Sequence, residues 1–214
     1  MSVKRPPRLY VIAGVNGSGK SSIAGATFRA LGSDYFNPDE AARRLMAVNP
    51  TLSQKAANSV AWRQGVRLLK RAIEERLDFA FETTLGGNTI TQVLAQAAAQ
   101  GIEIHIWYVG LSSPELHLER VRARVRRGGH DIPEKDIRRR YEHSRLNLIA
   151  LLPHLTALRV HDNSEEADPA AEEAPSLRLV LQMERAKILG PPNLSRTPDW
   201  AKPIVAAALK LNQA

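Results

Sequence analysis

Gly14-Val-Asn-Gly-Ser-Gly-Lys-Ser21 fills every fixed position of the phosphate-binding loop pattern G-x-x-x-x-G-K-[ST]. The residues before it, Arg8-Leu-Tyr-Val-Ile-Ala13, have the apolar character of a short buried strand. The residues after it, Ser22-Ile-Ala-Gly-Ala-Thr-Phe-Arg-Ala30, are typical of a helix. Because a strand, a glycine-rich turn and a helix follow in this order, the sequence predicts a nucleotide triphosphate site rather than an ordinary glycine turn.

The residue types of this loop match the chemistry of a polyphosphate. Glycines let the backbone curl so that its N–H groups point at phosphate oxygens, and the helix N-terminus adds partial positive charge. We expect Lys20 to reach the β- and γ-phosphates and the Ser21 hydroxyl to bind Mg²⁺, so ATP and Mg²⁺ are the predicted ligands. The residues predicted to bind the nucleotide are Gly14, Val15, Asn16, Gly17, Ser18, Gly19, Lys20, Ser21 and Ser22.

The composition fits one globular domain over residues 1–214. Hydrophobic residues make up 43% of the chain, too many for a disordered protein. The chain has no cysteine, which excludes disulfides and thiolate metal sites and favours a cytoplasmic location. No apolar run approaches the ~18 residues of a membrane-spanning helix, and the basic start lacks a signal-peptide pattern. We therefore expect no membrane partner.

The net charge of +8 raises the question of a nucleic-acid partner. Residues 120–145 hold nine arginines and one lysine against four acidic residues, so much of the excess is local. Arginine favours bidentate recognition of phosphate groups, and aromatic residues do not interleave with this run as they do in base-stacking surfaces. Binding to nucleic acid is therefore the less favoured interpretation, although it stays open.

Strand-like and helix-like segments alternate along the chain. We expect strands at 8–13, 34–37, 78–82, 102–109, 155–160 and 177–181, and helices at 22–30, 39–46, 51–77, 89–100, 114–127, 134–152 and 201–211. This alternation predicts an α/β fold of the P-loop NTPase type, a parallel sheet wrapped by helices on both faces. The final strand and helix fall in about residues 176–212.

Polar residues at the ends of the predicted strands are the candidates for substrate binding, because ligands lie at the carboxyl ends of parallel strands. Asp39 follows the second strand, where its carboxylate could accept a proton from an attacking hydroxyl or could simply support a helix start. Glu82 ends an apolar strand, a poor place for a charge without a ligand. With Thr83 and Thr84 it forms the predicted substrate-binding group.

The basic segment at 120–145 has the features of a lid. Gly128-Gly129 separates two predicted helices and gives a point of backbone freedom. Lid arginines can neutralise charge on a transferred phosphoryl group and exclude water on closing. We predict catalytic roles for Arg127 and Arg140, with Arg139 close behind. His130 could contact a phosphate or cap a turn, and the sequence leaves both open.

Several segments together resemble the zeta toxin family of P-loop kinases. They are the phosphate loop, Asn37-Pro-Asp39, Phe81-Glu-Thr-Thr84, Ile104-His-Ile-Trp-Tyr-Val-Gly-Leu111, Arg122-Ala-Arg-Val-Arg-Arg-Gly-Gly-His-Asp-Ile-Pro133 and Ile137-Arg-Arg-Arg-Tyr141. The resemblance covers about residues 8–165. The phosphate loop is shared by many families, whereas its combination with the Gly-Gly-His-Asp-Ile-Pro segment is more specific.

The resemblance implies an ATP-dependent kinase with an adenylate-kinase-like arrangement and, as toxins of the family have, a UDP-N-acetylsugar acceptor and an antitoxin partner. It implies that Asp39 is the base, that Glu82 and Thr84 hold the substrate, and that Arg127 and Arg140 bind phosphates. Two other functions stay open: a polynucleotide or nucleoside kinase, favoured by the net charge, and an ATP-gated interaction protein. Acidic residues at acceptor positions argue against the last, because a pure switch needs no acceptor site.

Overall fold

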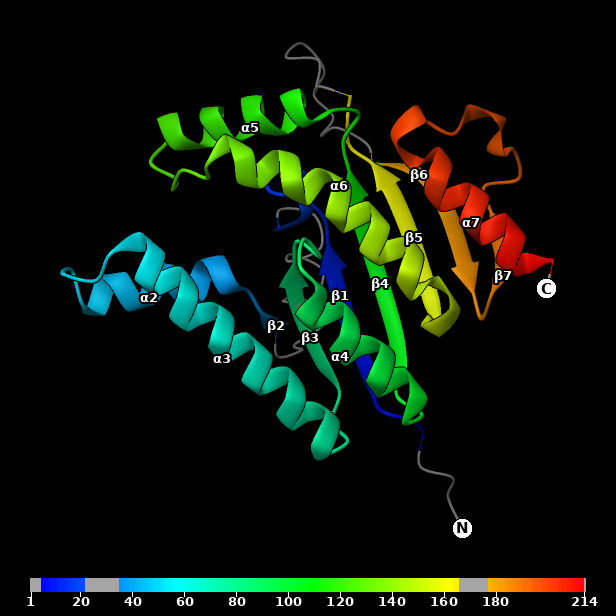
Figure 1. Ribbon diagram of the computed structural model, residues 1–214, viewed down its shortest axis with the longest axis horizontal. Coiled ribbons are helices and arrows are strands. Elements are labelled where there is room, and N and C mark those ends of the chain that lie inside the picture. Colours follow the sequence, from blue (N-terminus) through cyan, green and yellow to red (C-terminus); the bar gives the residue numbers. More distant parts are fainter. Residues whose placement is uncertain (1–4, 22–34, 166–176, 214) are drawn as a thin grey trace.

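The computed structural model describes residues 5–21, 35–165 and 177–213. Its centre is a seven-stranded sheet with the order β2-β3-β1-β4-β5-β6-β7 (Figure 1). The strands are β1 (Arg8–Ala13), β2 (Tyr35–Phe36), β3 (Phe79–Thr83), β4 (Glu103–Gly110), β5 (Ala157–Asp162), β6 (Arg178–Glu184) and β7 (Lys187–Gly190). The first five run parallel, as the sequence predicts.

The C-terminal edge of the sheet differs from the prediction. β6 pairs with β5 in the antiparallel direction, and β7, which the sequence did not predict, continues the antiparallel pairing. A two-residue turn joins β6 to β7, and both of its residues, Arg185 and Ala186, have positive φ angles of 44° and 66°. Turns of this kind usually carry Asn-Gly or Gly-Gly, so no hairpin was predicted here.

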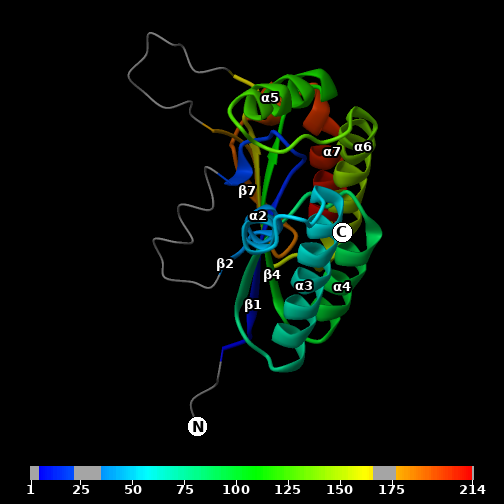
Figure 2. The same cartoon turned by 90° about the vertical axis from the view of Figure 1, so that its left-hand side faces the viewer.

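The described helices lie close to their predicted positions, with ends that differ by a few residues. They are α2 (Pro38–Val48), α3 (Gln54–Glu74), α4 (Asn88–Ala99), α5 (Pro114–Arg126), α6 (Glu134–Leu151) and α7 (Lys202–Asn212). Of these, α3, α4, α6 and α7 cover one face of the sheet (Figure 2). The predicted helix at 22–30 lies outside the described residues, together with Ser22. None of the helices in the described part of the chain combines the length and apolar character of a membrane span.

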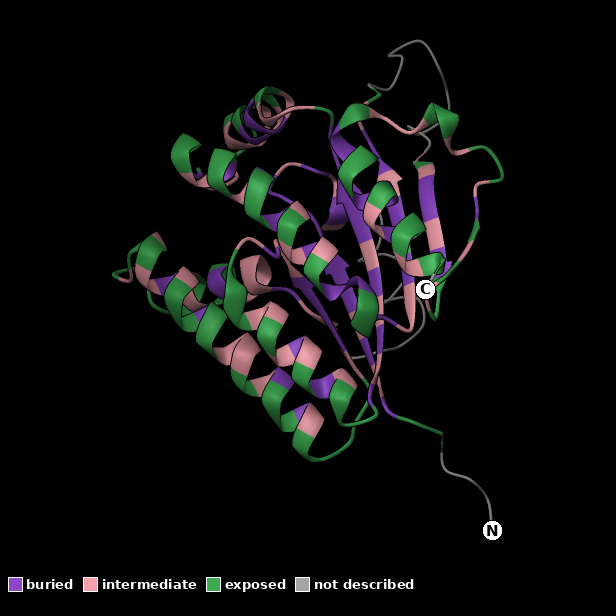
Figure 3. Ribbon diagram, turned by 45° about the vertical axis from the view of Figure 1, so that its right-hand side comes forward, coloured by how far each residue is buried: buried purple, intermediate pink, exposed green. Residues whose placement is uncertain are grey.

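The main core joins residues of the sheet to residues of these four helices, and much of the sheet is coloured as buried in Figure 3. Leu9 and Val11 of β1, Ile104 of β4 and Leu148 of α6 are all fully inaccessible to solvent. A second, smaller cluster joins Val15 of the phosphate loop to the lid helices α5 and α6. The lid therefore packs directly on the phosphate loop through apolar contacts.

Candidate active site

The phosphate loop leaves β1 and turns tightly beside the end of β4. Gly14, Gly17 and Gly19 have positive φ angles of 142°, 83° and 87°, a region that side chains disfavour. A Cβ atom on Gly14 would lie 2.2 Å from the backbone oxygen of Val109, so only glycine fits there. The loop thus has the backbone shape that a phosphate cradle requires.

Two side chains that sequence reasoning missed hold this loop from outside. The imidazole of His117 donates its Nδ1 hydrogen to the Asn16 backbone oxygen at 2.9 Å, and the Asn163 amide donates to the Ser18 backbone oxygen at 2.9 Å. Burial lowers the pKa of His117 to about 4, so it is neutral at pH 7 and Nδ1 is the donor. Asn163 directly follows β5, and this position at the end of a strand is the one feature of the sequence that could have indicated its role.

Glu82 lies at the centre of a buried hydrogen-bond cluster at the ends of β1 and β3. β1 and β3 run side by side with Ile12 opposite Glu82, which brings this carboxylate to the phosphate loop. Its Oε1 atom accepts a hydrogen bond from the Ser21 hydroxyl at 2.9 Å and lies 3.3 Å from the Lys20 ammonium. The predicted phosphate-binding lysine and the predicted metal-binding serine therefore share one carboxylate.

The other oxygen of Glu82 binds side chains near the start of α2. Tyr35 donates its hydroxyl hydrogen to Oε2 at 2.6 Å, and the Asn37 amide donates to it at 3.0 Å. Burial, followed by the negative charge of Glu82, raises the pKa of Tyr35 well above its usual range, so its hydroxyl keeps the proton. Only 4% of Glu82 is exposed, and both of its carboxylate oxygens have polar partners within the protein.

This arrangement fits Mg²⁺-ATP by the chemistry of its groups. The glycine turns, the buried ammonium of Lys20 and the following helix start provide donors and positive charge for a polyphosphate. Mg²⁺ prefers oxygen ligands and usually binds through one or two side chains plus phosphate oxygens, which the Ser21 hydroxyl and Glu82 carboxylate can supply. Within the described residues no cluster of three or more acidic, histidine or cysteine side chains forms a separate metal site.

Asp39 lies in the first turn of α2, but Asn37 performs the capping role. The Asn37 Oδ1 atom accepts hydrogen bonds from the backbone N–H groups of Asp39 at 2.8 Å and Glu40 at 3.2 Å. Pro38 occupies the first helical position, where its missing N–H costs nothing. Because Asn37 caps the helix, the Asp39 carboxylate is available to the pocket that it lines.

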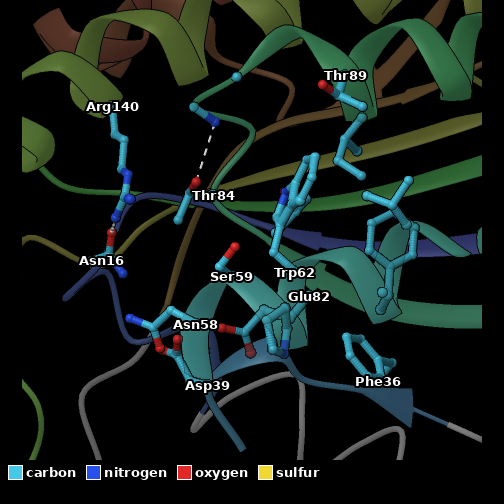
Figure 4. Close-up of a pocket in the computed structure, with 18 of the residues that line it drawn as sticks. Asn16, Phe36, Asp39, Asn58, Ser59, Trp62, Glu82, Thr84, Thr89 and Arg140 are labelled. Carbon is cyan, nitrogen blue, oxygen red and sulfur yellow. Dashed lines mark hydrogen bonds between the residues drawn. The ribbon is translucent and has the colours of Figure 1, made fainter. Parts of the chain in front are cut away.

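That pocket has a volume of about 360 Å³ and lies between α2, α3, the loop after β3 and the lid. Figure 4 shows Asp39 and Asn16 at one side, Trp62 and Thr89 at the other, and Ser59 between them. Its further lining includes apolar and polar groups such as Asn58, Val66, Phe81, Ile90 and Ile132. Trp62 is 47% exposed, so its indole forms part of the pocket mouth. The sequence analysis did not place α3 at the site.

The predicted substrate-binding threonines line the same pocket. The Thr83 hydroxyl oxygen accepts a hydrogen bond from the Leu85 backbone N–H, and the Thr84 hydroxyl oxygen accepts one from Gly86 (Figure 4). Because both hydroxyls act as acceptors here, each keeps a hydrogen that can be donated to a ligand. Glu82 also borders the pocket, although its carboxylate bonds to Ser21 of the phosphate loop and to Tyr35 and Asn37.

The two predicted catalytic arginines lie in different places. Arg140 donates a hydrogen bond from Nη1 to the Asn16 side-chain oxygen at 2.7 Å and lines the pocket, where burial lowers its pKa. Gly86 makes room for it, because a Cβ there would lie 2.6 Å from Arg140 Cγ. Arg127 caps the C-terminus of α5 and is exposed outside the pocket, so its role stays a prediction. Arg139 is also exposed and pairs with Asp136 at 3.1 Å.

Comparison with known proteins adds the family. The zeta toxin family profile matches residues 2–168. The chain belongs to the zeta toxin family. An uncharacterized protein of Haemophilus influenzae is 36% identical over 132 residues, which is 60% of this chain and 88% of that protein. The family match, together with the solved structures of the same fold, supports an ATP-dependent kinase.

Two solved structures with this fold are protein assemblies of different kinds. The complex of AvrRxo1-ORF1 and -ORF2 with ATP has a chain that matches with a TM-score of 0.67 at 14% identity, covering 95% of this zeta toxin family chain and 64% of the other. A chain of the PezAT toxin–antitoxin system of Streptococcus pneumoniae matches with a TM-score of 0.56 at 14% identity, covering 74% and 68%. This protein thus spans just under two thirds of the AvrRxo1 chain, and these identities show the fold alone.

Proposed function

We propose that the protein transfers the γ-phosphate of ATP to a hydroxyl group of a small molecule bound in the pocket beside Asp39. The observation that carries this proposal is the arrangement of one continuous pocket, which Lys20 borders from the phosphate loop and Asp39 from α2. A protein that only switches between nucleotide states would need Lys20 but would not need Asp39. The side chains beyond Asp39 then form the acceptor site.

Each group has a role that follows from its position. Bound Mg²⁺-ATP supplies the phosphoryl group and the neutralising metal charge. Lys20 leaves Glu82 for the phosphates, Glu82 and Ser21 provide oxygens for the metal, and Arg140 lies against the phosphate loop where charge develops. Asp39 accepts the proton of the attacking hydroxyl.

A UDP-N-acetylsugar is the first acceptor we propose to test. The pocket offers the Trp62 indole for a flat ring and the hydroxyls of Ser59, Thr83 and Thr84 for hydrogen bonds to a sugar. Family membership supports this choice, because toxins of the family act on such acceptors. The PezAT toxin–antitoxin neighbour supports a further proposal, that a protein antitoxin binds this chain.

A nucleoside or polynucleotide acceptor is the second candidate. Exposed basic residues of α3, Arg63, Arg67 and Lys70, line a shallow groove that also includes Trp62. A chain of the Pnkp1/Rnl/Hen1 RNA repair complex matches with a TM-score of 0.50 at 19% identity. Polyanion binding along this groove would weaken steeply with salt concentration.

The test is transfer of labelled phosphate from ATP to a panel of nucleotide sugars, nucleosides and short RNAs, with Asp39→Asn as the control. We expect one acceptor class to be labelled by the wild type and transfer by Asp39→Asn to fall by about 10²–10⁴-fold with unchanged ATP affinity. Labelling of no acceptor, or an equal loss of ATP binding in the variant, would contradict the proposal.

A further inference from the structure

His130, in the turn between α5 and α6, has a buried nitrogen without a partner. Only 12% of its side chain is exposed, and its Nε2 atom makes no hydrogen bond within the described residues. This atom lies 3.9 Å from the Asp39 Oδ1 atom, and both residues line the same pocket. The distance is too long for a direct hydrogen bond. Buried polar groups are normally bonded, so this nitrogen requires an explanation.

The backbone around His130 is held firmly, so the position of its ring is not an accident of a loose loop. Arg124 donates a hydrogen bond from Nη2 to the His130 backbone oxygen at 3.1 Å. The Gly129 N–H donates to the Arg124 backbone oxygen at 3.0 Å, and a Cβ on Gly129 would lie 2.7 Å from Arg124 Cγ. Two residues later, Ile132 is buried in the small core against the phosphate loop.

The charge of the ring follows from its surroundings. Burial lowers the pKa of His130, and the positive charges of Arg124 and Arg43 lower it further, against the opposite effect of Asp39 and Asp131. The imidazole is therefore neutral at pH 7 and carries one N–H group. A neutral donor beside the carboxylate of Asp39 is suited to bind a hydroxyl oxygen rather than a phosphate.

We propose that His130 Nε2 and Asp39 Oδ1 together bind the acceptor hydroxyl, which lies between them. One oxygen atom can lie about 2.8 Å from both atoms when they are 3.9 Å apart. This inference rests on the proposed function, because it requires a hydroxyl acceptor and Asp39 as its base. It adds a residue of the lid to the acceptor site and gives the unbonded nitrogen a partner.

The arrangement fixes the rotation of the attacking hydroxyl. The hydroxyl hydrogen points to Asp39 Oδ1, and one oxygen lone pair accepts the hydrogen of His130 Nε2. The second lone pair is then left to attack the γ-phosphorus. A new O–P bond forms, the bond from the γ-phosphorus to the bridging oxygen of ATP breaks, ADP leaves with those electrons, and the proton moves to Asp39. His130 donates one hydrogen bond throughout and gains no charge.

Three substitutions at one position test this role. His130→Ala removes the donor. His130→Gln places an amide N–H at about the reach of Nε2, whereas the shorter His130→Asn does not reach it. Asp131→Ala, in the same turn, is the matched control because the Asp131 side chain is exposed and accepts a hydrogen bond from the Ile132 N–H. Each variant is first checked for wild-type thermal unfolding and ATP affinity.

We expect the kcat/KM for the acceptor found in the panel to fall by about 10- to 100-fold in His130→Ala and His130→Asn, with the KM for ATP within twofold. His130→Gln should recover at least fivefold over His130→Asn, and Asp131→Ala should match the wild type. Wild-type transfer by His130→Ala, or equal activity of the Gln and Asn variants, would overturn the inference. The role of Asp39 as the base is tested separately by Asp39→Asn.

A second measurement needs no acceptor. NMR titration of the His130 imidazole should give a lower pKa in Asp39→Asn than in the wild type, because the carboxylate charge favours the protonated ring. An unchanged pKa would show that the two groups do not face each other and would overturn the inference by itself. If the wild type labels no acceptor, the proposed function fails, and the shared hydroxyl site fails with it.

Discussion

At the scale of single residues, the site depends on side chains that each have two tasks. Asn37 caps α2 with its oxygen and binds Glu82 with its amide nitrogen. Glu82 pairs with Lys20 and accepts from Ser21 with the same oxygen. Such shared contacts fix each group within hydrogen-bond distance of its neighbours before any ligand arrives, which lowers the cost of ordering them on binding.

Lys20→Ala should weaken ATP binding by about 10- to 100-fold, the range for loss of one hydrogen bond to a charged group. The fold should survive, because Glu82 still accepts from Ser21, Tyr35 and Asn37. Calorimetric titration with Mg²⁺-ATP measures the effect. Lys55→Ala, on the exposed surface of α3, is the control, and wild-type affinity in a folded Lys20→Ala protein would remove Lys20 from the nucleotide site.

Gly14→Ala should lower the free energy of unfolding by at least about 2 kcal/mol, because a methyl group meets the Val109 oxygen at a strained φ angle. Chemical unfolding measures the loss. Gly87→Ala is the control, since a Cβ there meets nothing within 4 Å. Equal stability of the two variants would show that the loop can move away from β4.

At the scale of elements, the starts of α2 and α3 are both capped, but they differ in whether they carry a predicted catalytic residue. Both helices begin with a side-chain cap, Asn37 for α2 and Ser53 for α3. Only α2 carries a predicted catalytic group in its first turn. Helices α5 and α6 differ again, since α5 packs on the phosphate loop through Leu118 and Val121 and α6 through Ile137.

Asn37→Ala and Ser53→Ala should each cost about 1 kcal/mol of stability for the lost cap. Only Asn37→Ala should also slow phosphate transfer, by at least 10-fold, because the first turn of α2 then frays at Asp39. Thermal unfolding and the transfer assay on the same preparations separate the two effects. Matching transfer rates for the two variants would show that cap geometry does not position Asp39.

At the scale of the whole molecule, parallel strand pairing collects distant segments at one edge of the sheet. The ends of β1, β3 and β4 are neighbours, so the phosphate loop, Glu82 and Val109 meet although they are far apart in sequence. The C-terminal segment is tied to the same sheet by Asp162, which accepts hydrogen bonds from Arg178 at 2.7 Å and the Trp200 indole at 3.2 Å. The packing of the whole sheet therefore helps to hold the phosphate loop in place.

The buried His117 should make the global stability depend on pH. Its folded pKa of about 4 lies below the unfolded value of about 6.5, so between these values the unfolded state binds more protons. The free energy of unfolding is therefore complete above about pH 6.5 and falls, by up to about 3 kcal/mol from this residue, as the pH drops toward 4.

Chemical unfolding of the wild type and His117→Asn at pH 7.5 and pH 5 tests this. Asparagine keeps a donor near Nδ1 and cannot titrate, so the loss between the two pH values should be smaller in the variant. Burial also lowers the pKa of His105 and His161, so part of the loss should remain. Exposed His154→Asn is the control, and an equal loss in His117→Asn and the wild type would contradict the assignment.

The sequence predicted the features that depend on local patterns. The phosphate loop follows from glycine, lysine and serine at fixed spacing, and the parallel strands from apolar runs separated by helical segments. Asp39 was predicted as the base because it follows the second strand, where an acceptor could lie. His117, Asn163 and Trp62 were missed, because a supporting or pocket-lining side chain on a helix has the same local pattern as a solvated or packed one. The β6–β7 hairpin lacked its usual turn residues.

What the sequence by itself determined is therefore the chemistry of the phosphate loop and the class of fold, since both depend on residues close together in the chain. The tertiary structure alone decided which of the crowded arginines reaches the loop. Arg140 is partly buried beside Asn16 and Arg127 is exposed. The physical reason is that composition sets the charge of a helix, whereas helix packing against the sheet sets the direction in which each side chain points.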